Sequence, residues 1–281
     1  MTTTTPPNAV PAGTAVPLSP ATGRLSPVDV LRSEWTKLRS VRSTVWSLAA
    51  LAVATVGLGA IITAVSNNRW RTFTLVERLS FDPTSRSLRG VFLAQLAIGV
   101  LGILVITSEY GTGMIRATLT AVPRRPLVLA AKTAVFGAVA LVVSEVVTFA
   151  AFFVGQSLLK SPVPHATLGQ PGVARAVVGS GIYLAVLGLF ALGIGSLIRH
   201  TAGAISIFVG ALLILPLILN AFPASVQQTL SKFLPLTVLQ AMISTQPRPD
   251  TFAPWTGLGL MAIYAAVVLV AAGVLFVRRD A

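Results

Sequence analysis

Six long apolar segments constrain this chain more than any other feature of its sequence. A helix needs roughly 20 mostly apolar residues to cross the ~30 Å hydrocarbon core of a bilayer. Five segments reach that length, and the second reaches it when Gly90 and Thr107 are counted into its ends. The segments run Val45–Val65, Val91–Ile106, Thr133–Leu159, Val173–Ile198, Gly203–Phe222 and Thr256–Val277. The sequence therefore predicts an all-α membrane protein with six transmembrane helices.

Composition supports this fold class and narrows the partners. Hydrophobic residues make up 54% of the chain and charged residues only 10%, whereas soluble domains carry about 25% charged residues. The formal net charge is +13, but the basic residues flank the apolar segments. That distribution is typical of contacts with anionic lipid headgroups rather than with nucleic acid. We therefore expect membrane lipid as a partner and no nucleic acid.

The sequence lacks the motifs of several common kinds of catalytic and metal site. It contains no cysteine, so disulfides, thiolate metal sites and cysteine nucleophiles are excluded. His165 and His200 lie in predicted loops without a carboxylate cluster nearby, which argues against a metal site. No H-E-x-x-H motif and no G-x-x-x-x-G-K-[ST] phosphate loop occurs. The sequence thus predicts a protein that is not an enzyme, carries no ATPase of its own and binds no cofactor.

The N-terminal segment differs in composition from the rest. Residues 1–25 are rich in Thr, Pro, Ala and Gly and cannot bury enough apolar surface to fold alone. A basic start followed by an apolar core is missing, which argues against a secretory signal peptide. We expect residues 1–25 to form a disordered cytoplasmic tail and residues 26–281 to form one six-helix transmembrane domain.

A helix is predicted between this tail and the first apolar segment. Ser26 and Pro27 have the pattern of an N-cap and a first helical residue. An apolar stripe follows at helical spacing and comprises Leu31, Trp35, Leu38 and Val41. Basic residues, among them Lys37 and Arg39, are expected on another face. This pattern predicts an N-terminal interfacial helix anchored by Trp35 in the headgroup plane; the alternative is a polar extension of the first span.

The orientation follows from the basic cluster in residues 32–42. Lysine and arginine next to the first span favour the cytoplasmic side. An even number of spans returns the C-terminus to the same side. We therefore predict a multi-pass protein of the cell membrane with both termini in the cytoplasm.

The loop after the second span, Thr107–Lys132, is more than a plain connector. Gly111 and Gly113 are expected to break the second span, and Thr112 is positioned to cap a new helix. Glu109 lies at the predicted membrane edge. We expect it to cap this segment or to pair with a basic residue of the N-terminal helix.

A short amphipathic helix is predicted next in the same loop. Its apolar stripe comprises Met114, Ile115, Thr118, Leu119 and Val122. Arg116 falls on another side, and Pro123 and Pro126 are expected to end the helix. Arg124, Arg125 and Lys132 are expected to mark the cytoplasmic membrane surface. Such a helix under the membrane is suited to receive force from a docked partner, and the alternative is an interfacial helix that only shapes the loop.

Four features together resemble a known transporter family. They are the segments LRSEWTKLRSVRSTVW, FDPTSRSLRGVFLAQLAIGVLGILVITSEYGTGMIRATLTAVPRRPLVLAAK and KFLPLTVLQAMI, and the six-span layout. With these features the chain resembles the membrane-spanning subunit of ABC-2 type transporters, in the actinobacterial permease group. The resemblance covers nearly everything after residue 25 and is most specific over Glu109–Lys132.

This resemblance implies a role for the two amphipathic segments. In that family the entry helix and the loop between the second and third spans contact a separate ATPase. By resemblance, Thr112–Val122 is the cytoplasmic coupling helix, and the working complex contains two permease and two ATPase subunits. The second permease subunit is either identical or different.

A few polar and small residues lie within the predicted spans. Glu145, Gln95 and Asn220 are the intramembrane polar residues, and a charge in hydrocarbon is costly enough to face a bundle interior. For Glu145 the alternatives are a translocation path, a subunit contact or a hydrogen bond between helices. Small residues at four-residue spacing in the fourth span are expected to allow close packing, either between subunits or within one; they include Gly181, Ala185, Gly188, Ala191 and Gly195.

The leading interpretation is an export permease of an ABC transporter, driven by ATP hydrolysis in a separate subunit. Its apolar spans favour a hydrophobic or amphipathic cargo. The alternative is a membrane module that does not transport, such as a sensor or immunity protein.

Overall fold

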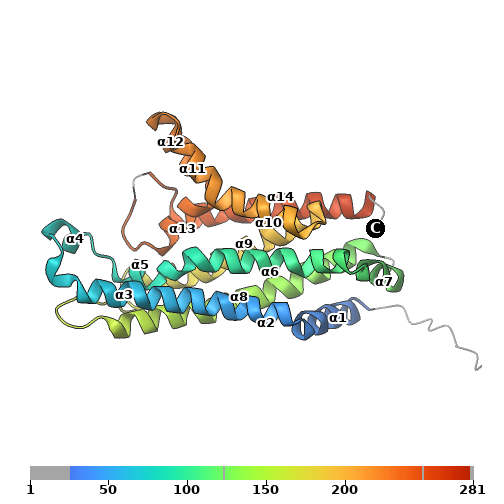
Figure 1. The fold of residues 1–281 in the computed structure, drawn as a ribbon, viewed down its shortest axis with the longest axis horizontal. Coiled ribbons are helices and arrows are strands. Elements are labelled where there is room, and N and C mark those ends of the chain that lie inside the picture. Colours follow the sequence, from blue (N-terminus) through green and yellow to red (C-terminus); the bar gives the residue numbers. More distant parts are fainter. Residues whose placement is uncertain (1–25, 123, 249, 279–281) are drawn as a thin grey trace, which may run out of the picture.

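The protein is a bundle of six long helices that lie side by side (Figure 1). The computed structural model describes residues 26–122, 124–248 and 250–278; the expected disordered tail, residues 1–25, lies outside them. Over the described residues the chain forms helices and loops and no strand. The six stretches long and apolar enough to cross a membrane are Arg42–Asn68, Pro83–Gly111, Arg125–Leu158, Val173–Ile198, Thr201–Leu219 and Pro254–Arg278. The all-α fold with six membrane-spanning helices is thereby confirmed.

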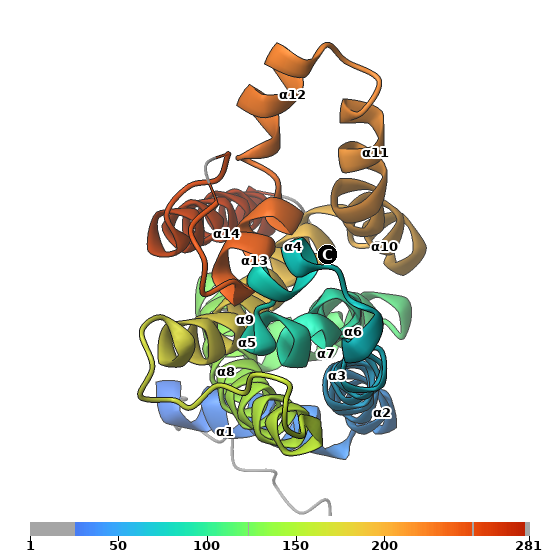
Figure 2. The same cartoon turned by 90° about the vertical axis from the view of Figure 1, so that its left-hand side faces the viewer.

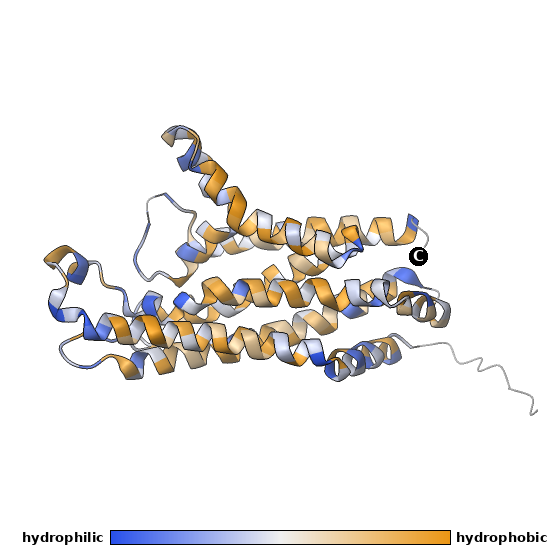
Figure 3. Ribbon diagram, viewed as in Figure 1, coloured by the Kyte–Doolittle hydropathy of each residue, from blue (hydrophilic) through white to orange (hydrophobic). Residues whose placement is uncertain are grey.

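Several spans consist of more than one helical element. The elements of the six spans are, in chain order, α2 (Arg42–Ala52), α3 (Leu58–Asn68), α5 (Pro83–Ser87), α6 (Val91–Gly111), α8 (Arg125–Leu158), α9 (Val173–Ile198), α10 (Thr201–Val209), α11 (Leu215–Leu219) and α14 (Pro254–Arg278). Short helices outside the spans are α1 (Pro27–Ser40), α4 (Leu75–Leu79), α7 (Met114–Ala121), α12 (Ala224–Ser231) and α13 (Pro235–Ile243). Apolar residues dominate the long helices, and polar residues gather at the two ends of the bundle (Figure 3).

Two spans begin eight residues earlier than the hydropathy pattern predicts. The second starts at Pro83 because Asp82 caps it, and the Asp82 carboxylate accepts a hydrogen bond from the Ser85 amide at 3.0 Å. The third starts at Arg125 because Pro126 lies in its first turn, where proline loses no hydrogen bond. Pro126 therefore begins a helix instead of ending one, and Pro123 lies outside the described residues.

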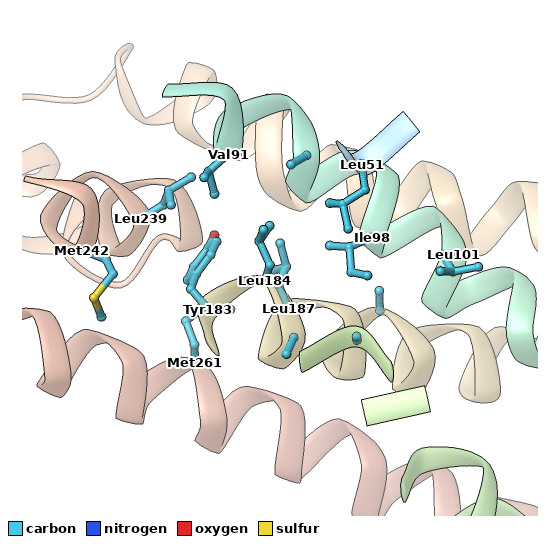
Figure 4. Close-up of a cluster of buried hydrophobic side chains, with 14 of the residues drawn as sticks. Leu51, Val91, Ile98, Leu101, Tyr183, Leu184, Leu187, Leu239, Met242 and Met261 are labelled. Carbon is cyan, nitrogen blue, oxygen red and sulfur yellow. The ribbon is translucent and has the colours of Figure 1, made fainter. Parts of the chain in front are cut away.

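Helix α9 forms the centre of the bundle (Figure 2). It packs against α6, α8 and α14, and 72% of its most apolar window is buried. Figure 4 shows Tyr183 of α9 among apolar side chains from α6, α13 and α14. The Tyr183 hydroxyl lies 3.1 Å from Gln95 Oε1 and 3.0 Å from the Pro235 carbonyl oxygen. One of the predicted intramembrane polar residues, Gln95, is thus a buried hydrogen-bond acceptor.

Small residues let α9 approach its neighbours within this single chain. A Cβ on Gly102 of α6 would lie 2.4 Å from the Gly188 carbonyl oxygen of α9, too close for any side chain. A Cβ on Gly195 would meet Ile106 at 2.9 Å. Of the two alternatives for the small residues in the fourth span, close packing within one subunit accounts for these positions.

The fifth span is bent and attached to the bundle on one side. Its α10 packs against α6 and α9, but α11 and the following α12 extend away from the bundle (Figures 1 and 2). A π-helical turn, Gly210–Ile214, separates α10 from α11, and Pro216 lies in the first turn of α11. Proline cannot donate the backbone hydrogen bond there, which explains the bend.

The two ends of the bundle carry different accessory helices. Helices α1 and α7 and the end of α14 lie together at one end, whereas α4, α12 and α13 lie toward the other (Figure 1). The α9–α10 turn is very short, and His200 caps α10 by accepting a hydrogen bond from the Gly203 amide at 3.2 Å. The short helices α12 and α13 follow the fifth span, and α13 is largely buried.

Candidate functional site: a buried charge cluster that joins four helices

Four charged side chains meet where α1 and α7 join the bundle. Lys132 Nζ of α8 lies 2.6 Å from Glu34 Oε2 of α1 and 2.8 Å from Glu109 Oε1 of α6. Lys37 Nζ of α1 lies 2.8 Å from Glu34 Oε1 and 3.1 Å from Glu109 Oε1. We call these four residues the charge cluster. The expected pairing of Glu109 with a basic residue of the N-terminal helix is confirmed, with Lys37 as that residue.

The charge cluster extends to the short helix α7 through Lys37. Its ammonium donates a hydrogen bond to Thr118 Oγ1 of α7 at 3.2 Å. Burial alone would lower the pKa of Lys37, but the hydrogen bond and charge of Glu34, together with Glu109, outweigh it and raise the pKa. The stabilising contribution of Lys37 is therefore complete below the ordinary lysine pKa and is lost as the pH rises through the higher folded-state value. At neutral pH the link to α7 is charged.

Helix α1 presents Glu34 to the bundle on a face that is otherwise apolar. A capping box fixes the start of the helix, in which Ser26 accepts from the Val28 amide and Asp29 from the Ser26 amide. The buried residues Val30, Glu34 and Leu38 recur every four positions, and α1 packs against α8. Of the four residues in the predicted apolar stripe, Leu38 alone lies on this buried face.

A second face of α1 leaves apolar residues uncovered. Leu31, Trp35 and Val41 are 37–50% exposed. Of the two basic residues expected on the polar face, Arg39 is exposed, while Lys37 turns into the charge cluster. The exposed Trp35 is compatible with an anchor at the membrane surface, and the interfacial role of α1 stays a prediction.

Helix α7, Met114–Ala121, lies within the predicted range Thr112–Val122, but its inner and outer faces differ from the expected pattern. Gly113 adopts a left-handed conformation, φ 71°, which favours glycine and separates α6 from α7 just after Gly111. Thr112 is not the cap, because its hydroxyl donates to the Ser108 carbonyl oxygen of α6 at 2.9 Å. Ile115 is only 2% exposed and anchors α7 to its own chain.

The outward face of α7 is therefore formed by other residues. Arg116, Ala117, Thr120 and Ala121 are exposed, whereas Leu119 and Val122 are partly buried. A partner that docks on α7 would meet this exposed face, and it would not meet the expected apolar residue Ile115.

Lys132 is the member of the charge cluster that sequence reasoning misplaced. It was expected to mark the membrane surface, but α8 begins seven residues before it and carries it inward, where its side chain is 3% exposed. Glu34 was not recognised at all. The sequence feature that could have revealed Glu34 is its position, four residues after Val30 and four before Leu38, which puts it on the face that α1 buries.

The other predicted polar residues lie apart from the charge cluster. Glu145 is half-buried on α8 beside Gly181 of α9, where a Cβ on the glycine would lie 2.6 Å from the carboxyl carbon. Its Oε2 is buried and has no hydrogen-bond partner among the described residues. Asn220 lies just after α11 and the fifth span, is exposed, and accepts a hydrogen bond from Gln227 Nε2 at 2.7 Å.

The site offers structural coupling and no metal-binding chemistry. Among the described residues, no three His, Cys, Asp or Glu side chains gather as they would around a metal. Instead, two carboxylates and two ammonium groups form a cluster of zero net charge. Burying charges is costly, and removing one partner from such a pair leaves an uncompensated buried charge. The cluster therefore couples the positions of α1, α6, α7 and α8.

Comparison with known families shows which family the chain belongs to. A family model described as an ABC-2 family transporter protein matches residues 30–216, well over half of the 281 residues. The chain belongs to the ABC-2 transporter family. The matched region runs from α1 to α11 and contains every member of the charge cluster. A comparison with curated proteins found no match.

Membership in this family accounts for the general character of the chain. ABC-2 permeases are membrane components of ABC transporters and lack an ATPase of their own. The multi-pass architecture and the transporter assignment thus agree, and the narrower actinobacterial group stays a prediction.

The charge cluster generates a prediction for Lys132. Lys132→Met keeps the length of the side chain but leaves Glu34 and Glu109 with one cation between them. We expect the free energy of unfolding to fall by about 3–5 kcal/mol, measured by denaturant titration of the purified protein in detergent micelles. The matched control is Lys160→Met at an exposed position, where we expect a change within about 0.5 kcal/mol.

A second variant tests the cause of this loss. Adding Glu34→Gln to Lys132→Met restores zero net charge in the cluster and should recover part of the stability. Equal stability of Lys132→Met and Lys160→Met would show that the cluster does not stabilise the fold.

Proposed function

We propose that this chain is the permease subunit of an ABC exporter and is driven by a separate ATPase subunit. The observation that carries the proposal is the hydrogen bond from Lys37 to Thr118, which joins α7 to the charge cluster. A force on α7 would reach α1 through Lys37, and it would reach α6 and α8 through Glu109 and Lys132. Helix α7 thus has the mechanical connections that a coupling helix needs.

The proposed complex has a defined orientation. Helices α1 and α7 and the end of α14 share one end of the bundle (Figure 1), and we place this end in the cytoplasm of the cell. The basic residues 32–42 support this orientation. A separate ATPase would dock on the exposed face of α7, around Arg116 and Ala117.

A second permease subunit completes the proposed complex. Helices α11 and α12 extend from the bundle, and α11 exposes Leu215, Leu217 and Ile218 by 44–65%. This one-sided attachment of the fifth span supports a contact with another permease copy, identical or different. The apolar spans favour a hydrophobic or amphipathic cargo, and Glu145 is the acidic residue of the third span that such a cargo or a subunit contact would meet.

The orientation has a direct test. The chain has no cysteine, so Thr120→Cys introduces one unique thiol on the exposed face of α7. A membrane-impermeant maleimide should leave this thiol unlabelled in intact cells and label it after permeabilisation. Ser80→Cys, at an exposed position between the first two spans, should be labelled in intact cells. The reverse pattern would contradict the cytoplasmic placement of α7.

The docking of an ATPase on α7 is tested by a charge on its outer face. Ala117→Asp places a carboxylate at an exposed position, so folding should change by less than about 0.5 kcal/mol. We expect at least a tenfold loss of copurified ATPase, because an unpaired charge buried at an interface is costly.

The control for this variant is Ala224→Asp on α12, a helix of equal length at the other end of the bundle. It should retain the ATPase. If Ala117→Asp binds the ATPase and supports ATP hydrolysis like the unchanged protein, α7 is only a connector. If the native complex contains no ATPase at all, the alternative of a module that does not transport is favoured.

A further inference from the structure

A small pocket opens beside the charge cluster, between α1, α2, α6 and α8. Its volume is about 50 Å³, roughly the space for three or four water-sized groups. All four cluster residues line its polar end. Its other wall is apolar and includes Leu104, Val105 and Val135. The pocket is therefore amphipathic and lies where α1 leads into α2, the start of the first span.

Glu109 lines this pocket and carries an unused hydrogen-bond acceptor. Its Oε1 receives both lysines, whereas its buried Oε2 has no hydrogen-bond partner among the described residues. The whole residue is 3% exposed. The three N–H groups of Lys37 are already directed at Glu34, Glu109 and Thr118. A buried carboxylate oxygen without a donor is costly, so a donor from outside the chain would stabilise it.

A second part of the pocket lining, at the start of α2, favours a negative charge. Ser43 and Thr44 line it and lie in the first turn of α2. The N-terminus of α2 has no side-chain cap, and the amides of a first helical turn favour anions. Ser43 is exposed, so this end is accessible. The lining thus combines an acceptor on Glu109 that lacks a donor with the start of α2, where an anion is favoured.

We propose that this pocket binds the headgroup of a phospholipid that carries a primary ammonium, with ethanolamine as the simplest case. The ammonium donates a hydrogen bond to Glu109 Oε2, and the phosphate lies at the start of α2 near Ser43. An ammonioethyl group has the size of a few water molecules and fits the pocket. The acyl chains extend along the apolar wall toward the membrane. The bound headgroup then fills the space between α1 and α6 and supports the charge cluster.

The proposal distinguishes two headgroups of equal charge that differ in their donors and in the size of the ammonium group. Choline carries the same positive charge as ethanolamine but has no N–H group to donate. The protein is reconstituted in bilayers that contain phosphatidylglycerol and equal amounts of phosphatidylethanolamine and phosphatidylcholine, then extracted, and the retained lipids are counted by native mass spectrometry. We expect one phosphatidylethanolamine per chain, retained about tenfold over phosphatidylcholine, as one charge-assisted hydrogen bond would give.

Two substitutions on the same helix locate the site. Leu104→Phe fills the pocket from its apolar wall and leaves the charge cluster unchanged, so it should abolish the preference. Leu93→Phe is the matched control on a surface that is 49% exposed to the surroundings of the bundle, and it should keep the preference. Melting temperatures of both variants verify that the fold is retained.

Each result decides the proposal. Equal retention of the two lipids, or an equal preference in Leu104→Phe and Leu93→Phe, would overturn it. Soluble phosphoethanolamine added to the delipidated protein separates the two sources of an ammonium. If it raises the melting temperature as much as the lipid does, the pocket binds a free amine and the lipid assignment is wrong. These measurements need no ATPase, so they do not depend on the proposed function.

Discussion

The ion pairs among Glu34, Glu109, Lys37 and Lys132 determine how the short helices at one end of the bundle are held. Apolar packing positions the long helices, but it is non-directional and leaves α1 and α7 weakly specified. Charged hydrogen bonds have defined geometry and a high cost of disruption when buried. Lys132 lies at the centre of the cluster, at 2.6 Å from Glu34 and 2.8 Å from Glu109. A displacement of α7 therefore cannot leave α1 and the spans unaffected.

The same cluster relates the family assignment to a mechanism. In the proposed complex, the effect of ATP hydrolysis in another subunit passes to the spans, and the contacts of Lys37 with Thr118 and Glu109 form a continuous path from α7 to α1 and α6. The amphipathic pocket lies beside this path. A bound headgroup there would make the packing of α1 against α6 sensitive to the lipid composition of the membrane.

Much of this architecture could be predicted from the sequence because its causes are local. Runs of apolar residues give the six spans, and Gly111 and Gly113 separate α6 from α7. The pairing of Glu109 with the N-terminal helix was one of two expected roles, because a carboxylate and a basic helix were both placed at the membrane edge. These signals require only hydropathy, backbone conformation and charge.

The remaining features depend on contacts that distant segments make. Lys132 was placed at the membrane surface because hydropathy alone starts the third span at Thr133, whereas the fold starts α8 earlier. Glu34 lies on a face of α1 that is buried only because α8 covers it, and Ile115 points inward for a comparable reason. Helical periodicity gives the faces of a helix, but it does not say which face a neighbour covers.

Hydrogen exchange of α7 tests the link between this helix and the cluster most directly. Lys37→Met and Thr118→Val each remove one side of the hydrogen bond, and amide exchange is followed by mass spectrometry in peptides from α7, with α14 as the internal reference. We predict faster exchange over Met114–Ala121 in each single variant, unchanged exchange in α14, and no further increase in the double variant, because both changes break the same contact. Unchanged exchange of α7 in the single variants, or effects that simply add in the double variant, would contradict the account.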